Sequence, residues 1–254
     1  MSILRDELIS FLDSYLSVSS GHDPALNGLQ VVGKAQVQRV ALGVSANLDL
    51  FAAAARWGAD LVLVHHGLIW RDEPQPIDFL MKKRLKLLFD HDITLLAYHL
   101  PLDAHAEVGN NIQISTRLGL ELVEDHVAFY SGWPIGIIGQ TKRRMPLTEL
   151  VAQVNALFNT SSTVFPFGPE NVQKVAILSG GGASDVLEAV RKGCDVYLTG
   201  EAKEPTPALC RESGITYIAA GHYNTEKFGV QALGELLRQQ FGLEVQFFDV
   251  PNPL

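Results

Sequence analysis

The sequence has 254 residues, of which 47% are hydrophobic and 19% charged, with a formal net charge of −8 at pH 7. This is the composition of an ordinary globular protein and excludes a largely disordered chain. The acidic balance disfavours a nucleic-acid partner, which needs a basic face. The chain carries only two cysteines, no signal-type start and no membrane-spanning apolar run. We therefore exclude a disulfide scaffold and expect a cytoplasmic protein without a membrane partner.

The predicted elements alternate between helices and strands. Residues 3–16 show helical apolar spacing, and residues 22–33 are rich in turn-forming types. A strand at 37–44, a helix at 48–57 and a short apolar strand at 61–64 follow. Such an apolar strand is typical of a parallel sheet covered on both faces, so the three form a βαβ unit. Later predicted strands cover 93–97, 134–140, 215–219 and 243–249, and later helices cover 109–118, 146–158 and 225–240.

The βαβ unit occurs twice. Residues 37–66 align without a gap on residues 172–201, and nine of the aligned positions are identical. Each copy continues with a helix and another strand. We predict an α/β fold of duplicated units, with mixed or parallel sheets and flanking helices. The predicted organisation is a single compact body of two intertwined halves: 1–125 with 220–254, and 126–219.

Residues of types that can bind metals follow several of the predicted strands. His65 and His66 come directly after the apolar strand 61–64. Ligands gather at the carboxyl ends of such strands, and adjacent side chains alternate in direction, so each histidine can serve its own ion. Asp103 follows a strand of the first copy, and His222 and Glu226 follow the matching strand of the second. The alternative for each histidine is an ordinary hydrogen-bonded side chain.

Three imidazoles and two carboxylates are enough ligands for two divalent ions about 3.5–4 Å apart if a carboxylate bridges them. We predict the ligands to be His65, His66, Asp103, His222 and Glu226. Nitrogen and oxygen ligands without a thiolate favour Zn²⁺, Mn²⁺, Fe²⁺ or Co²⁺. Cys194 and Cys210 are interpreted as small core residues.

Five motifs together make a resemblance specific: His-His-Gly at 65–67, His-x3-Asp at 99–103, Thr-Gly-Glu at 199–201, Gly-His-Tyr-x-Thr-Glu at 221–226, and Asn-Gly-Leu-Gln-Val at 27–31. The whole chain resembles the short form, without an inserted domain, of the Nif-three-like family of dinuclear metal proteins. Many members carry the name GTP cyclohydrolase 1 type 2 homolog. The resemblance implies the same five ligands, with Glu226 touching both ions, and a ring-shaped homohexamer whose sites face an inner cavity.

Three other positions need a separate interpretation. Where family members often have an aspartate after the first strand, this chain has Ser45-Ala46-Asn47. His99 and Glu201 fall opposite ligand positions in the repeat. We expect His99 to orient a ligand or act as an acid or base, and Glu201 to accept a hydrogen bond behind a ligand. The alternative is that both satisfy backbone groups at strand ends.

The sequence favours a metal-dependent hydrolase that acts on a nucleotide or related small molecule. The family name suggests GTP ring opening, although no Walker-type phosphate loop is present. Gly180–Gly182, before a helix near Ser184, forms either an anion site or a tight strand-to-helix turn. The alternatives are a protein for metal storage or delivery and a ring-shaped scaffold, both without turnover.

Overall fold

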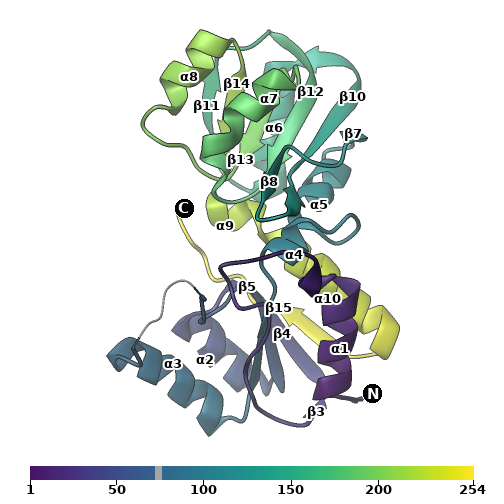
Figure 1. Cartoon of the computed structure of the whole chain (residues 1–254), viewed down its shortest axis with the longest axis vertical. Helices are drawn as coiled ribbons and strands as arrows, with labels where there is room; N and C mark the ends of the chain where they lie inside the picture. Colours follow the sequence, from purple (N-terminus) through teal and green to yellow (C-terminus); the bar gives the residue numbers. More distant parts are fainter. Residues whose placement is uncertain (72–75) are drawn as a thin grey trace. The chain divides into compact units, whose positions relative to one another are not determined.

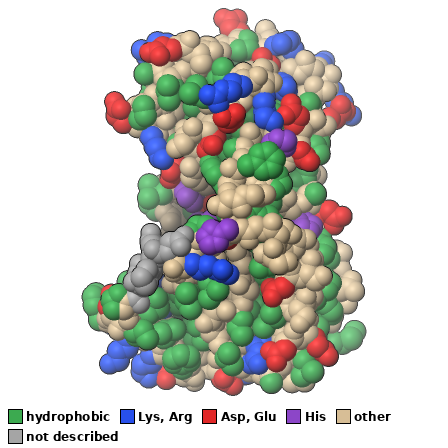
Figure 2. Space-filling model, in the orientation of Figure 1, with side chains coloured by type: hydrophobic (Ala, Val, Ile, Leu, Met, Phe, Trp, Pro, Cys, Tyr) green, Lys and Arg blue, Asp and Glu red, His purple; other side chains and the backbone are tan. Residues whose placement is uncertain are grey.

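The computed structural model describes residues 1–71 and 76–254, which form two units (Figure 1). The first unit contains residues 1–102 and 229–251, and the second contains 103–228 and 252–254. The halves predicted from the sequence divide at 125 and 219 instead. Within the described ranges, no helix is long and apolar enough to cross a membrane. Acidic and basic side chains are interspersed over the face drawn in Figure 2.

The first unit is built on a sheet with the strand order β15-β4-β5-β6-β2. Strands β15, β4, β5 and β6 are parallel, and β2 is antiparallel to β6. The bounds are β2 Gly28–Val31, β4 Arg39–Ser45, β5 Leu61–His66, β6 Thr94–Ala97 and β15 Glu244–Phe247, and a small separate pair is β1 Ile3–Leu4 with β3 Gln36–Val37. Strand β5 thus continues through the two histidines that we had placed after it, and β2 lies inside the segment that we had interpreted as turns.

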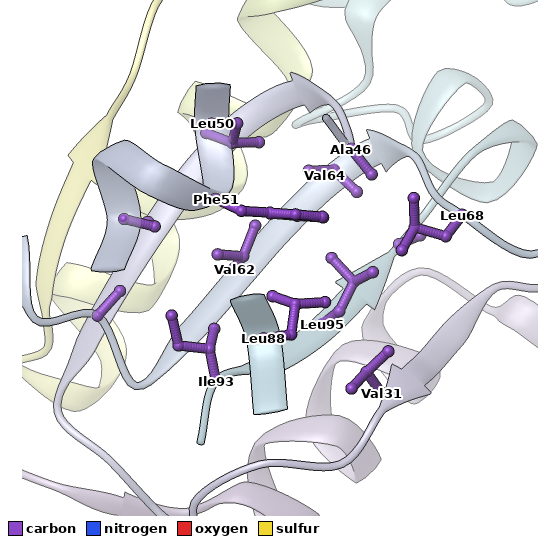
Figure 3. Close-up of a cluster of buried hydrophobic side chains, with 14 residues drawn as sticks. Val31, Ala46, Leu50, Phe51, Val62, Val64, Leu68, Leu88, Ile93 and Leu95 are labelled. Atoms are coloured by element: carbon purple, nitrogen blue, oxygen red, sulfur yellow. The ribbon is translucent and has the colours of Figure 1, made fainter. Parts of the chain in front are cut away.

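Helices cover both faces of this sheet. Their bounds are α1 Arg5–Tyr15, α2 Leu48–Trp57, α3 Phe79–Asp90 and α10 Lys227–Phe241, with a short 3-10 turn at Val18–Ser20. Phe51 of α2 and Leu88 of α3 pack in one apolar cluster with Val62 and Leu95 of the strands (Figure 3). On the other face α10 approaches β4 so closely that a Cβ on Gly234 would lie 2.2 Å from a methyl carbon of the Leu42 side chain.

The second unit has the strand order β11-β14-β13-β12-β10-β7. Strands β12, β13 and β14 are parallel, and the flanking strands β7, β10 and β11 pair antiparallel. The bounds are β7 Glu121–Glu124, β10 Ile137–Pro146, β11 Thr163–Pro166, β12 Asn171–Leu178, β13 Val196–Thr199 and β14 Thr216–Ala219, and a separate hairpin is β8 Ala128–Tyr130 with β9 Trp133–Ile135. The predicted strand 134–140 is in fact two strands, because Gly136 has a φ of +75°.

The helices of the second unit also cover two faces (Figure 1). Their bounds are α4 Leu100–Asp103, which begins in the first unit, α5 Asn110–Arg117, α6 Leu147–Phe158, the 3-10 turn Gly182–Asp185, α7 Val186–Arg191, α8 Thr206–Ser213 and α9 His222–Thr225. Ile114 of α5 and Leu150 of α6 join Val175 and Val196 of the sheet in one core cluster. Helices α7 and α8 lie on the opposite face. The predicted helix 225–240 is broken at Glu226, between α9 and α10.

The structure confirms the duplicated α/β fold. In the first unit β4, α2, β5, α3 and β6 follow each other, and in the second β12, α7, β13, α8 and β14 do the same. The aspartate shared by the two repeats has the same function in both. Asp60 accepts hydrogen bonds from the backbone N–H groups of residues 38 and 39 at 2.9 and 3.0 Å. Asp195 accepts them from residues 173 and 174 at 2.8 and 3.1 Å.

The replacement of Asp60 by asparagine tests this contact. Burial alone would raise the pKa of the Asp60 carboxyl, but Lys34 and the two backbone N–H groups hold it below its ordinary value of 3.8. At neutral pH we expect Asp60→Asn to lower the free energy of unfolding by about 1–3 kcal/mol, measured by urea denaturation. Because the folded pKa is depressed, the difference from wild type should shrink as the pH falls below 3.8. The exposed Asp49→Asn serves as the control, and a loss that does not change with pH would contradict this account.

Candidate metal site

The turn after β5 is held by a glutamine from β2. The side-chain oxygen of Gln30 accepts the backbone N–H of Leu68 at 2.7 Å. Gly67 lies so close to this amide that a Cβ there would be 2.3 Å from Gln30 Nε2. A larger residue would therefore push the turn away from Gln30. The contact fixes the chain directly after His65 and His66.

The two histidines at the end of β5 have different partners. His65 is completely buried, and its Nδ1 lies 2.9 Å from the backbone oxygen of Tyr98. Because a carbonyl oxygen only accepts, Nδ1 carries a proton, and in the neutral ring the lone pair is then on Nε2. The Tyr98 hydroxyl in turn donates to Asp13 at 2.8 Å. His66 Nδ1 lies 3.3 Å from the hydroxyl of Ser45, the last residue of β4.

The turn that precedes β2 positions His99. Asp23 is only 4% exposed, and its carboxylate lies 2.9 Å from His99 Nδ1. The same carboxylate accepts the backbone N–H groups of Ala25 and Leu100, each at 2.8 Å, and the Asn27 amide at 2.9 Å. Asn27 also accepts the backbone N–H of His99 at 2.7 Å. Burial would raise the pKa of Asp23, but the hydrogen bonds from His99, Asn27 and the Ala25 backbone, with His99 first, hold it below its ordinary value.

Three imidazoles gather in the first unit as a result. Ring centroids lie 4.6 Å apart for His65 and His66, 5.0 Å for His65 and His99, and 5.5 Å for His66 and His99. One nitrogen from each ring lies within 4.8 Å of one from each other ring, which makes this group a candidate metal cluster. The Trp70 ring meets the His99 ring edge-on, at 5.2 Å between centroids.

In the second unit, Asp103 lies at the end of α4 and is 8% exposed. One carboxylate oxygen accepts the Asn110 amide at 2.8 Å and the Ser179 hydroxyl at 3.1 Å. Asn111 donates to the backbone oxygen of Asp103 at 3.1 Å and accepts the backbone N–H of Ser179 at 2.8 Å. The first turn of α5 thus fixes both the backbone and the carboxylate of Asp103.

His222 lies between two glutamates. Its Nε2 is 3.2 Å from a carboxylate oxygen of Glu226, and its Nδ1 is 3.3 Å from one of Glu201. Glu226 is 3% exposed. The hydrogen bond and the negative charge of Glu226, together with those of Glu201, outweigh the lowering effect of burial. They raise the pKa of His222 to about 9. Gly180 has a φ of +64°, and a Cβ there would lie 2.1 Å from Glu226, so the three-glycine segment is a tight turn packed against this pair.

The predicted site residues therefore fall into two sets. The first unit contains His65, His66 and His99, and the second contains Asp103, Glu201, His222 and Glu226. We keep as a prediction that the five ligands together bind one pair of ions. Several residues that hold these side chains were not predicted to do so: Asp13, Asp23, Asn27, Gln30, Tyr98, Asn110, Asn111 and Ser179. The motif at 27–31 contained two of them, but its sequence indicated only a turn.

The fold and these clusters define an α/β protein with candidate sites for divalent metals. The chain belongs to the DUF34/NIF3 family: the family model described as Duf34/NIF3 (NGG1p interacting factor 3) matches residues 3–253. This finding confirms the resemblance drawn from the motifs.

Relatives and solved structures agree with the family. A protein of Pseudomonas aeruginosa named GTP cyclohydrolase 1 type 2 homolog is 40% identical over 253 residues, which cover 100% of both chains. A protein of the same name from Pyrococcus horikoshii is 42% identical and covers 98% of this chain and 99% of its own. The structure titled protein ybgI, unknown function, has a TM-score of 0.94 at 39% identity, covering 99% of this chain and 100% of that one.

The charge state of His222 is open to direct measurement. In the metal-free protein we expect the ring to titrate at about pH 9, because two carboxylates stabilise the imidazolium. Histidine NMR shifts followed against pH report this value. Glu226→Gln should lower the pKa of His222 more than Glu201→Gln does, and the exposed Glu204→Gln should leave it unchanged. A wild-type midpoint at the ordinary value of 6.5 would contradict the described pairing.

Proposed function

We propose that this protein is a hydrolase that depends on divalent metal ions and acts on a nucleotide or a related small molecule. The proposed ligands are His65, His66, Asp103, His222 and Glu226, with two ions per chain. One observation carries the proposal: metal-binding side chains gather at the carboxyl ends of parallel strands in both units. His65 and His66 end β5, His99 follows β6, and His222 with the buried Glu226 follows β14. In open α/β sheets this is where ligands bind.

The residues in both units fit divalent ions chemically. Burying a carboxylate costs free energy unless a cation or several donors compensate its charge. Asp103 and Glu226 are 8% and 3% exposed as whole residues. The His222 imidazolium supplies a positive charge beside Glu226 in the metal-free protein. A divalent ion would take over that function, with the neutral imidazole as a ligand. Nitrogen and oxygen donors suit Zn²⁺, Mn²⁺, Fe²⁺ or Co²⁺.

The ions would supply a water of lowered pKa and would polarise a substrate oxygen. The protein's own side chains orient the ligands. Glu201, beside His222 Nδ1, would fix the direction of that ring. His99 faces His65 and His66 and would orient a ligand or exchange a proton with the substrate.

A purine nucleotide is the first substrate to test, because relatives at about 40% identity are named GTP cyclohydrolase 1 type 2 homolog. The glycine segment 180–182 adds no phosphate site to the proposal, since it packs against Glu226 and leads into a helix of six residues. Bound divalent ions would instead be the largest positive charges available to an anionic substrate. Metal storage or delivery without turnover is the alternative for the same ligands.

Metal content tests the proposal first. Protein purified without metal affinity and without chelator should contain about two divalent ions per chain. His66→Ala in the first unit and Glu226→Gln in the second should each lower the content, because each removes a ligand. The exposed His91→Ala is the matched control and should keep the wild-type content. Wild-type protein that stays metal-free after incubation with each candidate ion would overturn the proposal.

Turnover is tested on the loaded protein. We expect at least one purine nucleotide to be converted, with GTP as the first choice, and the conversion to stop in Glu226→Gln. Chromatography of the reaction mixture measures the loss of substrate. A full complement of metal without conversion across a nucleotide panel would favour storage or delivery over hydrolysis.

The proposal includes a homohexamer in the cytoplasm. Both cysteines are buried thiols, 9% and 0% exposed, which agrees with their interpretation as core residues and supports a reducing compartment. Light scattering after size exclusion should give six times the 27.8 kDa mass of one chain. The mass of a monomer would contradict the ring.

A further inference from the structure

The second unit has a cavity of about 370 Å³ between the strand β8 and the helix α7 (Figure 1). Residues 126–129 line it from the side of the strand, and Asp185, Glu188 and Lys192 line it from the side of the helix. The volume lies within the range of about 300–1,000 Å³ that small-molecule sites occupy. The described residues that line the cavity include none of the predicted metal ligands, so the proposed function makes no use of it.

A hydrogen bond ties the two sides of the cavity together. Strand β8 pairs with β9 in a hairpin, and its last residue, Tyr130, follows Phe129. The hydroxyl of Tyr130 donates to the carboxylate of Asp185. Burial and this carboxylate raise the pKa of Tyr130 well above its ordinary value of 10.0, so the hydroxyl keeps its proton at neutral pH. The hairpin is therefore fixed against the start of α7, and the cavity is already formed in the protein without a ligand.

The strand side of the cavity offers an aromatic surface. Phe129 lines the cavity and is 62% exposed. The imidazole of His126 lies beside it, with 4.6 Å between the ring centroids and an angle of 51° between the ring planes. Such rings can pack against the apolar body of a ligand, and the face of a phenyl ring attracts a cation.

The one ammonium group that lines the cavity from the helix side has its charge compensated within the protein. Lys192 donates to the carboxylate of Glu124 at 2.7 Å and to the backbone oxygen of His126 at 3.2 Å. The hydrogen bond from Lys192 holds the pKa of Glu124 below its ordinary value of 4.5, so this carboxylate is charged at neutral pH. Lys192 therefore adds little positive charge to the cavity.

The two carboxylates on the helix side keep most of their negative charge. Asp185 accepts the hydroxyl of Tyr130, which is a neutral donor. Glu188 forms an ion pair with Arg191, but the two side chains are 41% and 65% exposed. Exposed pairs of this kind are weak, because water screens their attraction. The helix side of the cavity is thus negative, and the strand side is aromatic.

This combination favours one class of ligand. Carboxylates attract a positive group, and their hydrogen bonds with an ammonium or guanidinium group are stronger than those between neutral groups. The same carboxylates repel an anion. A metal ion is disfavoured, because His126, Asp185 and Glu188 do not belong to any group of described residues whose ligand atoms lie close enough to share an ion. An organic cation uses both the charge and the aromatic surface.

We propose that this cavity is a second binding site, which takes an organic cation: an amine or a guanidinium compound with an apolar or aromatic body. Asp185 and Glu188 bind the positive group, and Phe129 packs against the body. The site goes beyond the proposed metal-dependent function and does not rest on it. The experiments are therefore done on the whole chain in the presence of EDTA, which keeps divalent ions out of the metal clusters.

Three probes with the same ring separate charge from shape. Benzylammonium is a cation at neutral pH, benzyl alcohol is neutral and benzoate is an anion. Saturation-transfer NMR, which observes the ligand, measures the binding of each one. We expect saturable binding of benzylammonium. Benzyl alcohol and benzoate should bind at least about tenfold more weakly, because they lack the charge-assisted hydrogen bonds.

Variants of both sides locate the site. Asp185→Asn keeps an oxygen that can accept the Tyr130 hydroxyl but removes the negative charge. We expect it to weaken the binding of benzylammonium by about tenfold or more. Phe129→Leu keeps an apolar side chain but removes the ring face, and should weaken binding by about two- to fivefold.

Glu188→Gln has a matched control in the first unit. Glu235 and Arg238 form an exposed pair three residues apart on a helix, as Glu188 and Arg191 do. We expect Glu188→Gln to weaken the binding of benzylammonium by about tenfold, and Glu235→Gln to leave it unchanged. Wild-type affinity in both Asp185→Asn and Glu188→Gln would overturn the inference.

The wild-type protein alone gives a readout if a variant fails to fold. Equal binding of benzylammonium and benzyl alcohol would overturn the inference, and so would the absence of benzylammonium binding up to about 10 mM. Both results would leave the metal content, and with it the proposed function, untouched.

Discussion

Three carboxylates, those of Asp23, Asp103 and Glu226, are almost completely removed from water, and the local structure around each is built to compensate its charge. A buried carboxylate without partners would be protonated or would unfold its surroundings. Asp23 receives donors from a turn and from residues 99 and 100. Asp103 receives them from α5 and the loop after β12, and Glu226 lies 3.2 Å from the His222 ring, whose pKa it raises. The imidazoles of His99 beside Asp23 and of His222 beside Glu226 are therefore held in fixed directions, as metal ligands need to be.

Duplication explains how these groups came to stand at equivalent places. Both units carry three parallel strands joined by helices. In each, the equivalent aspartate, Asp60 or Asp195, accepts a backbone N–H at the start of the repeat. The segments after the first strand have diverged. In the first unit Asn47 caps a helix of ten residues by accepting a backbone N–H, and Ser45 lies beside His66. In the second unit three glycines fill the aligned positions, and Gly180 makes room for Glu226.

Much of this could be predicted from the sequence, because periodicity and strand-end position are local signals. The helix at 48–57, the repeat and the presence of His65, His66 and His222 beside other polar groups followed from them. The break of the last helix at Glu226 could not, since the apolar spacing continues across it. The contact between Asp23 and His99 spans 76 residues of chain, and nothing in a turn-rich segment indicates which distant side chain it will hold. The sequence showed which residues have the chemistry, whereas their tautomers and hydrogen bonds required the fold.

X-ray absorption of the zinc-loaded wild-type protein tests the central claim most directly, that these histidines and carboxylates hold divalent metal ions. The account predicts a first shell of nitrogen and oxygen, outer-shell scattering typical of several imidazoles, and a metal–metal distance of about 3.5–4 Å. A sulfur shell would contradict it by assigning the ions to the cysteines. A spectrum without imidazole scattering would contradict it as well, because the bound zinc would then not be held by the histidines.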